Sequence, residues 1–511
     1  MADKTKFIEE LNAKYQPKGE YIVLGKGMLD GEVITEVDVN IPLKTINRHG
    51  LIAGATGTGK TKTLQVFVEQ LSHKGIPTLV MDIKGDLSGI AVEGEQNDKI
   101  NERYAKTKLP YQPQSFPVEL MTISAEKGLK LRATVTEFGP VLLSKILGLN
   151  DTQSSIMSIV FKYADDKGLP LIDLDDLKKT LQYVTDNDEG KKELASNYGA
   201  ISPASLGAIL RSIVALEQQG ATSFFGEPSF DVEDLLQTRG GKGVVNVLRV
   251  ADIQNQPQLF STFMLSLFAE IYMTFPEEGD SGKPKLVLFI DEAHLIFNEA
   301  SKALLSQIET MVKLIRSKGV GIYFITQIPG DVPENVLAQL GLKIQHALRG
   351  FTAKDRKEID KAVENYPITE YYDAGNLIQN LGIGEAFVTA LDEKGIPTPL
   401  VQTYLISPES RMDVLTSDEI DDLVNASDLA EKYNKEIDKE SAYEILTKRM
   451  ETAAAAEQEI KQEKSTARQP KEEPGMFEQV LKSRAGRTFT NTLAREGAKF
   501  VLGMFGLKMR R

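Results

Sequence analysis

The sequence predicts an α/β protein with a mostly parallel sheet, a helical insertion and a helical C-terminal extension. Runs that are apolar at nearly every position are typical of strands covered by helices on both faces. About 160 residues separate the second run from the third, too many for one crossover helix, so a largely helical insertion is expected at about 135–240. The apolar runs lie at 49–54, 78–82, 243–250, 285–291 and 321–327.

Composition bounds the class of protein. The chain has 511 residues, 41% of them apolar and 26% charged, which suits two or three globular domains. The net charge of −13 argues against a surface that binds nucleic acid everywhere, although local basic patches remain possible. The chain has no cysteine, which excludes disulfides and thiolate metal sites and favours the reducing cytoplasm. The four histidines lack metal-ligand spacing.

Residues 1–45 are expected to form a short N-terminal extension. Its first residues, MADKTKFIEELNAKY, are charged and lack the apolar core of a signal peptide. The stretch at 21–39 predicts a rudimentary strand pair at most.

The apolar window at 259–275 is interrupted by Glu270 and is short for a membrane span, so it predicts a buried helix.

A phosphate-binding loop follows the first apolar run. The sequence GATGTGKT at 54–61 matches G-x-x-x-x-G-K-[ST] in full, and apolar residues at helical spacing follow it. Glycines let backbone N–H groups face the phosphates, Lys60 reaches the β- and γ-phosphates, and the Thr61 hydroxyl suits Mg²⁺. The predicted nucleotide-binding residues are Gly54, Ala55, Thr56, Gly57, Thr58, Gly59, Lys60, Thr61 and Lys62.

Polar residues end the second and fourth apolar runs. Asp291 and Glu292 follow LVLFI, at the sheet edge where open α/β folds bind ligands. Downstream of a phosphate loop, this pair predicts that Asp291 holds Mg²⁺ and that Glu292 polarises the attacking water. Asp82, Lys84 and Asp86 follow the second run. They contact the nucleotide, couple the site to a neighbour, or simply cap the turn after the strand.

Three further residues are candidates for charge stabilisation during hydrolysis. Gln327 ends the fifth run and is predicted to sense the γ-phosphate and the attacking water. Arg316 precedes the same run and Arg349 lies farther along the chain. Hydrolysis needs positive charge beyond Lys60 and Mg²⁺, which an arginine can supply. From the residues alone, either arginine also fits a surface ion pair.

The composition changes past residue 410. Residues 411–450 predict helices, 451–475 a flexible linker, and 476–511 a basic amphipathic tail. The tail has eight Lys or Arg against two Asp or Glu. Such a tail can contact a neighbouring subunit, nucleic acid or an acidic membrane surface.

The assembled motifs resemble the HerA/FtsK branch of the additional-strand P-loop ATPases. Within it, the chain is similar to the bacterial HerA-like C-terminal-domain family of YjgR type, over about residues 15–410. The motifs are RHGLIAGATGTGKTKTLQ, MDIKGDLSG, LRATVTEFGP, FIDEAHLIF, LIRSKGVGIYFITQ and VLAQLGLKIQHALRGF.

The resemblance implies a RecA-like ATPase domain at 46–410 that binds ATP and Mg²⁺. It further implies a homo-oligomeric, hexameric ring with ATP at the subunit interfaces, Arg316 as a finger supplied to the neighbour, and Arg349 as a second sensor. Relatives translocate DNA, which gives a helicase or translocase acting on double-stranded DNA as the first hypothesis. The alternative is an ATPase that remodels or switches a protein partner, or acts at a membrane surface, without moving DNA.

Overall fold

A computed structural model describes residues 3–254, 256–279, 281–299, 302–350, 352–435, 437 and 439–466. The chain divides into two compact units. Unit 1 contains Met1–Leu131 and Phe230–Lys435, and unit 2 contains Arg132–Ser229 together with the chain from Glu436 onward. The basic tail predicted at 476–511 lies outside the described residues.

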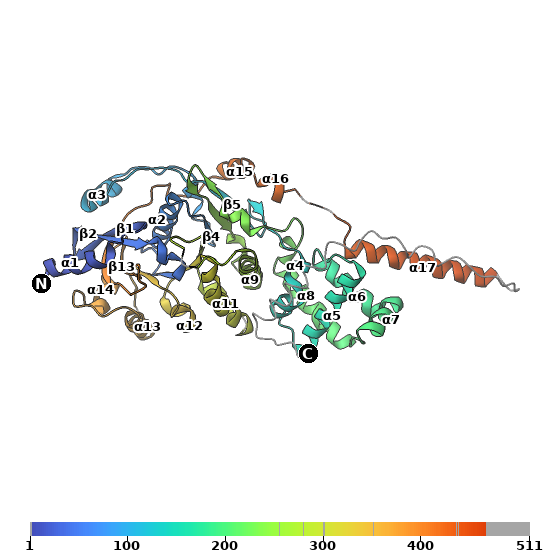
Figure 1. The fold of residues 1–511 in the computed structure, drawn as a ribbon. Coiled ribbons are helices and arrows are strands. Elements are labelled where there is room, and N and C mark those ends of the chain that lie inside the picture. Colours follow the sequence, from blue (N-terminus) through green and yellow to red (C-terminus); the bar gives the residue numbers. More distant parts are fainter. Residues whose placement is uncertain are drawn as a thin grey trace. The chain divides into compact units, whose positions relative to one another are not determined.

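Unit 1 is built on a 12-stranded sheet with the order β2-β1-β14-β13-β12-β3-β11-β10-β4-β9-β5-β6. Figure 1 labels β1, β2, β4, β5 and β13 of this sheet. Every pair from β12 to β6 is parallel, and the pairs from β2 to β13 and between β13 and β12 are antiparallel. The predicted α/β fold with a mostly parallel sheet is therefore confirmed. The strands are β1 Tyr21–Leu29, β2 Glu32–Pro42, β3 Gly50–Ala53, β4 Thr78–Asp82, β5 Val118–Thr122, β6 Leu129–Lys130, β9 Val245–Arg249, β10 Leu286–Ile290, β11 Val320–Thr326, β12 Leu342–Gln345, β13 Glu385–Thr389 and β14 Val401–Leu405, with a separate pair β7 Thr238–Arg239 and β8 Lys242–Gly243.

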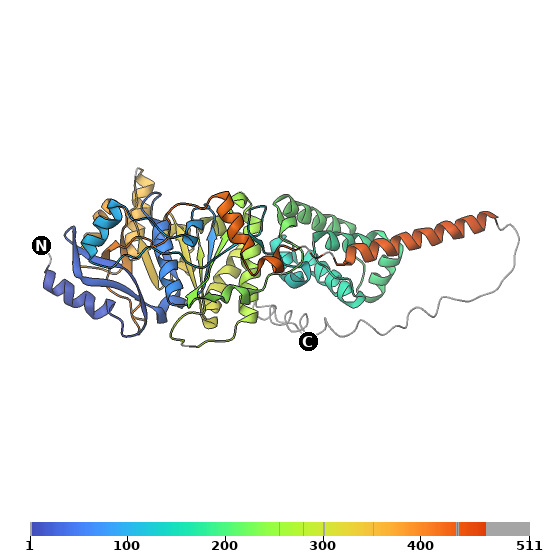
Figure 2. The same cartoon turned by 90° about the horizontal axis from the view of Figure 1, so that it is seen from above.

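Helices cover both faces of this sheet (Figure 2). On one face, the Phe67 ring of α2 (Lys60–His73) lies 5.6 Å from that of Phe289 and 5.0 Å from that of Tyr323. Because strand side chains alternate between faces, Phe324 points the other way, and its ring meets Phe297 of α10 (His294–Glu299) at 5.3 Å. The remaining helices of unit 1 are α1 Lys4–Tyr15, α3 Asp98–Thr107, α9 Pro257–Thr274, α11 Lys302–Ile315, α12 Glu334–Leu337, α13 Ala353–Glu364, α14 Ala374–Asn380, α15 Ser417–Asn425 and α16 Ala430–Tyr433, with 3₁₀ turns at η1 Leu43–Arg48, η2 Ser88–Ala91, η4 Val232–Leu236, η5 Ala251–Ile253, η6 Arg316–Lys318 and η7 Pro329–Asp331.

The buried helix predicted at 259–275 is confirmed as α9. Most of its large apolar side chains, among them Leu259, Phe263 and Leu267, are buried, whereas Met273 near its C-terminal end is 45% exposed. Among the described residues, no helix is long and apolar enough to cross a membrane.

The N-terminal residues belong to the sheet instead of standing apart from it. β1 and β2 form an antiparallel hairpin of nine and eleven residues, and β1 pairs with β14. The Tyr15 hydroxyl donates to the carbonyl oxygen of Pro399 at 2.8 Å. The rudimentary strand pair expected at 21–39 is thus longer than predicted, and unit 1 has no boundary at residue 45.

Unit 2 is helical. It contains α4 Val135–Ile146, α5 Asp151–Lys167, α6 Leu174–Asp186, α7 Asp188–Asn197, α8 Pro203–Gln218, the 3₁₀ turn η3 Ala221–Ser223, and α17 Ala442–Thr466. α17 is fixed at its start, where the backbone N–H of Tyr443 donates to Asp176 at 2.7 Å. The helix runs through part of the stretch predicted as a linker at 451–475, because Ala, Glu, Gln and Lys there are strong helix formers. The extension expected at 411–450 is divided between the two units.

Candidate active site at the carboxyl edge of the sheet

The phosphate loop connects β3 to α2 in a backbone conformation that requires glycine. Gly57 and Gly59 have φ of 79° and 109°, in the left-handed region that side chains disfavour. A Cβ on Gly54 would lie 2.4 Å from the Cβ of His346, which is fully buried beneath the loop. Burial lowers the pKa of His346 to about 3, so the imidazole is neutral there. The conformation of the loop therefore depends on its glycines and on the close packing of His346 against Gly54.

Lys60 begins α2 and is buried. Its Nζ donates to the carbonyl oxygens of Gly54 at 2.6 Å and Ala55 at 3.1 Å, so the side chain curls back over the loop. Burial, followed by the charge of Lys84, lowers the pKa of Lys60, while Glu292 and Asp291 oppose the shift. This ammonium lies where a bound phosphate chain would supply its counter-charge.

The other predicted loop residues divide into two groups. Thr56 and Gly57 are exposed, and Ala55, Gly59 and Thr61 are partly buried beside them. The remaining two face the protein. The hydroxyl of Thr58 donates to the Ala55 carbonyl at 2.7 Å, and Lys62 Nζ donates to the Met412 carbonyl at 2.5 Å. Lys62 therefore offers a nucleotide its backbone and not its side chain.

Asp291 and Glu292 follow β10 and are both buried, with 3% and 7% of their surfaces exposed. Burial raises the pKa of Asp291 to about 7, and the nearby Lys84 ammonium limits the rise. Glu292 has a φ of 46°, an uncommon conformation for a non-glycine residue that concentrates at functional sites. Asp291 Oδ2 and Glu292 Oε2 are buried and accept no hydrogen bond from the described residues, and the Nδ1 atom of His294 lies 3.2 Å from Glu292 Oε2.

Lys84 connects the polar residues that follow β4, Asp82, Lys84 and Asp86, to Asp291 and Glu292. Its Nζ forms an ion pair with Glu292 Oε1 and lies 3.9 Å from Asp291 Oδ2. Burial lowers the pKa of Lys84, but the two carboxylates outweigh it and the net shift is upward. Asp82 has a different role, because its carboxylate accepts hydrogen bonds from the backbone N–H groups of the next turn, at Gly85 (2.7 Å), Asp86 (3.1 Å) and Leu87 (3.1 Å). The capped turn is therefore seen at Asp82, and Lys84 faces the carboxylates of Asp291 and Glu292.

β11 links the two halves of the site. It lies between β3 and β10. At its end, the Thr326 carbonyl accepts the N–H of Gly54 at 3.2 Å, and the Ile325 carbonyl accepts the N–H of Ala293 at 2.9 Å. Gln327, the next residue, is exposed at this edge. The fold therefore brings Lys60, Asp291, Glu292 and Gln327 to one edge of the sheet.

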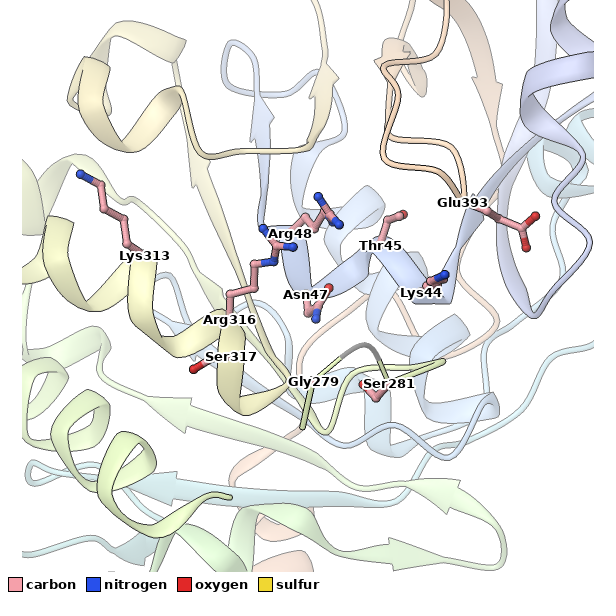
Figure 3. Close-up of a pocket in the computed structure, with 10 residues that line it drawn as sticks. All are labelled: Lys44, Thr45, Asn47, Arg48, Gly279, Ser281, Lys313, Arg316, Ser317 and Glu393. Carbon is pink, nitrogen blue, oxygen red and sulfur yellow. The ribbon is translucent and has the colours of Figure 1, made fainter. Parts of the chain in front are cut away.

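Arg316 lies at the opposite edge. It opens η6, ahead of β11, and a strand of seven residues separates it from Gln327. It lines a cavity of about 360 Å³ with three further basic residues, Lys44, Arg48 and Lys313 (Figure 3). Glu393, the acidic residue of the lining, accepts the backbone N–H groups of Lys18 at 3.2 Å and Gly19 at 2.7 Å. The cavity is therefore strongly basic.

Arg48 is a second arginine of this cavity that the sequence reading did not select. The sequence feature that could have identified Arg48 is its position in INRHG, directly before the first predicted strand. Arg349 lies elsewhere. It follows β12, is exposed, and its guanidinium donates to the Gln379 carbonyl at the end of α14.

Comparison with known proteins assigns the family. The family described as Helicase HerA-like C-terminal matches residues 29–505, most of the chain. The protein belongs to this family. It is 22% identical over 385 residues to the DNA double-strand break repair helicase HerA of Saccharolobus solfataricus, covering 74% of this chain and 68% of that one.

Solved structures resemble this HerA-like chain in fold. The plasmid coupling protein TrwB, in complex with a non-hydrolysable ATP analogue, matches with a TM-score of 0.50 and 15% identity, covering 82% of this chain and 96% of that one. VirB4 of Thermoanaerobacter pseudethanolicus has a TM-score of 0.48 and 17% identity, covering 76% and 97%. At this level of identity the match to TrwB shows a shared fold.

The carboxyl edge of this HerA-like chain suits a nucleotide with Mg²⁺. Buried carboxylate oxygens without hydrogen-bond partners are the hard ligands that Mg²⁺ prefers, and Asp291 Oδ2 is one of them. The Thr61 hydroxyl is the other group expected to hold the ion, and Lys60 and the loop glycines are the residues that would hold the phosphates. Groups of three or more metal-binding side chains do not occur in the described part of the chain.

Proposed function

We propose that this protein hydrolyses ATP as a subunit of a ring-shaped motor of HerA/FtsK type that acts on double-stranded DNA. The observation that carries the ATPase assignment is the pair of backbone hydrogen bonds at the end of β11. They join the phosphate loop to the turn that bears Asp291 and Glu292. Phosphate binding and water activation thereby share one rigid edge of the sheet. The cysteine-free chain suits a cytoplasmic location.

In this proposal each residue of the edge has one task. Lys60 and the loop N–H groups hold the phosphates and offset the charge that develops on them. Asp291 and Thr61 hold Mg²⁺, which supplies further charge neutralisation when bound. Glu292 accepts the proton of the attacking water, with Lys84 paired to its Oε1 and His294 Nδ1 3.2 Å from its Oε2. Gln327 orients that water, and Arg349 acts as a second sensor.

The position of Arg316 supports a ring. β11 has seven residues, so Arg316 lies roughly 20 Å from the carboxyl edge of its own subunit. An arginine at that distance cannot reach the phosphates held by its own loop. It can serve a loop on a neighbouring subunit that docks against the basic cavity. A closed homo-oligomer, such as a hexamer, provides this contact for every subunit.

DNA as the substrate is supported by family membership and by the similarity to a relative named as a DNA repair helicase. The test measures ATPase rate with and without double-stranded DNA, on the full chain and on a chain ending near residue 475. We expect DNA to stimulate the rate, and the stimulation to weaken as salt rises because phosphate contacts release counterions. Absence of stimulation and of DNA retention would refute the DNA motor and favour a partner-remodelling or membrane-surface ATPase.

The site assignment has its own test. Lys60→Ala and Glu292→Gln are each expected to abolish turnover, the first through phosphate binding and the second through loss of the base. Glu292→Gln keeps the size of the side chain, so its thermal unfolding curve serves as the control for folding. Full activity in either variant contradicts the assignment.

A further inference from the structure

The loop Gly382–Gly384 is attached to the phosphate loop. It connects α14 to β13, and the N–H of Gly384 donates to the Thr58 carbonyl at 3.2 Å. A Cβ on Gly59 would lie 3.4 Å from the Gly384 nitrogen, so the two loops are in close backbone contact. Any nucleotide held by the phosphate loop is therefore a neighbour of this second loop.

Arg103 of α3 holds the second loop in place. Its Nη2 donates to the Ile383 carbonyl at 3.1 Å, and its Nη1 donates to the carbonyls of Gly384 at 3.2 Å and Leu405 at 2.7 Å. The guanidinium also lies 4.2 Å from the centre of the Tyr404 ring. Three carbonyls bound by one planar group fix the loop backbone, including the Cα of Ile383.

Ile383 is exposed although its backbone is fixed. Its exposed fraction is 74%, in a loop that already contacts the phosphate loop. When a ligand covers a large apolar side chain that was held in solvent, burial of that apolar surface stabilises the complex. The loop thus offers an apolar contact at a defined position.

Strand order indicates which part of the nucleotide reaches Ile383. Along the carboxyl edge, β10 and β11 lie on one side of β3, and β12 and β13 lie on the other. Glu292 follows β10, so the γ-phosphate lies on that first side of the phosphate loop. The phosphate chain then leads away from Glu292, toward the side where Ile383 precedes β13. The nucleoside end, and not the phosphates, meets this residue.

We propose that Ile383 packs against the base of the nucleoside triphosphate held by the phosphate loop, and that Arg103 is its positioning residue. The inference rests on the proposed nucleotide-binding function and names a part of the site that the phosphate loop does not contain. Ile383 then contributes to affinity for the nucleoside, whereas the phosphate loop recognises only the phosphates.

The test compares two ligands that share the phosphates. Dissociation constants for MgATP and for magnesium tripolyphosphate are measured by calorimetry on the full chain and on Ile383→Ala. We expect the variant to bind MgATP about tenfold more weakly, because buried apolar contact is lost, and to bind tripolyphosphate as the wild type does. Arg103→Ala is expected to show the same selective loss, since it frees the loop that carries Ile383.

Ile396→Ala is the matched control. Ile396 is 49% exposed and lies beyond the other end of β13, at the opposite edge of the sheet. It should leave both affinities unchanged.

Equal loss of both ligands in Ile383→Ala would overturn the inference, because the residue would then act on the phosphate loop itself. Unchanged affinity for MgATP would overturn it as well, while leaving the ATPase proposal standing if the wild type hydrolyses ATP. A wild type that binds neither ligand would overturn the proposed function, and the role of Ile383 with it.

Discussion

Lys84 and Glu292 form an ion pair in the part of the site where water activation is proposed. A general base must lie within hydrogen-bond reach of the proton that it abstracts, so the orientation of its carboxylate matters. Lys84 forms an ion pair with Oε1, and His294 Nδ1 lies 3.2 Å from Oε2, so both neighbours orient the carboxylate. The same ammonium lies 3.9 Å from Asp291 Oδ2 and offsets the charge of that buried carboxylate.

Lys84→Met is expected to lower kcat for ATP by about tenfold or more with little change in KM, because Lys84 acts through Glu292 and not on the substrate. Steady-state ATPase kinetics measure the effect. Lys84→Arg keeps the charge and should retain more activity than Lys84→Met. A higher KM with unchanged kcat would instead assign Lys84 to nucleotide binding.

Asp291 predicts a pH dependence of stability. Its pKa is raised to about 7 in the folded state, so the folded protein keeps a proton that the unfolded chain loses near pH 4. The associated stability is complete below that unfolded pKa and is lost as pH rises through 7. We therefore expect Asp291→Asn to exceed the wild type in free energy of unfolding by about 2 kcal/mol at pH 8, and by less at pH 5.

Denaturant unfolding without Mg²⁺ at the two pH values measures this difference. Asp421→Asn, at a carboxylate whose side chain is 49% exposed, is the control and should show no such pH dependence. An Asp291→Asn variant less stable than the wild type at pH 8 would contradict the burial argument.

At the scale of elements, α17 shows how a distant segment completes a unit. Its residues follow unit 1 in sequence, yet its first turns pack on α6, with Leu446 fully buried and the Ala442 N–H bound to the Pro170 carbonyl at 2.9 Å. The helix therefore closes the core of unit 2 from outside the inserted segment.

Leu446→Ala should destabilise unit 2 by about 2–4 kcal/mol, because it opens a cavity in a closed core. Hydrogen exchange of α6 and α17 amides measures the loss, and amides of α2 in unit 1 report whether it is local. Met450→Ala, on the same helix with 37% of its surface exposed, should cost less than about 0.5 kcal/mol. If amide protection were equal in the two variants, α17 would not be part of the core of unit 2.

At the scale of the whole molecule, the separation of Arg316 from Lys60 predicts complementation between subunits. Lys60→Ala and Arg316→Ala should each be inactive alone. In a mixed ring, an intact loop on an Arg316→Ala subunit can meet an intact arginine on a Lys60→Ala neighbour. Random one-to-one mixing should restore up to about a quarter of the wild-type ATPase rate, since that fraction of interfaces is complete.

Size measured by light scattering with and without nucleotide checks that mixed oligomers form. A monomer that hydrolyses ATP at the full rate would exclude the finger from a neighbour. Arg349→Ala is the control variant. Arg349 follows β12, which pairs with β3 next to the phosphate loop, so we expect it to act in the same subunit as Lys60. Mixing with Lys60→Ala should therefore not restore the activity of Arg349→Ala.

Sequence alone predicted the central strands and the loop from local signals. Five apolar runs identified β3, β4, β9, β10 and β11 because strands covered on both faces are apolar throughout. The antiparallel strands β1, β2, β13 and β14 were missed or underestimated, since short or alternating patterns, and glycines in β1, resemble loop sequence. The full loop motif specified Gly54–Thr61 because each residue type there has a local conformational or chemical reason.

Only the tertiary structure decided which distant residues meet. Lys84 with Glu292, His346 beneath Gly54, Arg48 beside Arg316, and Ile383 beside the phosphate loop are brought together by strand order and not by spacing in sequence. Apolar periodicity and glycine conformation are properties of a few consecutive residues, so a single sequence carries them. Contacts across a 12-stranded sheet depend on how its strands are ordered, which no local pattern encodes.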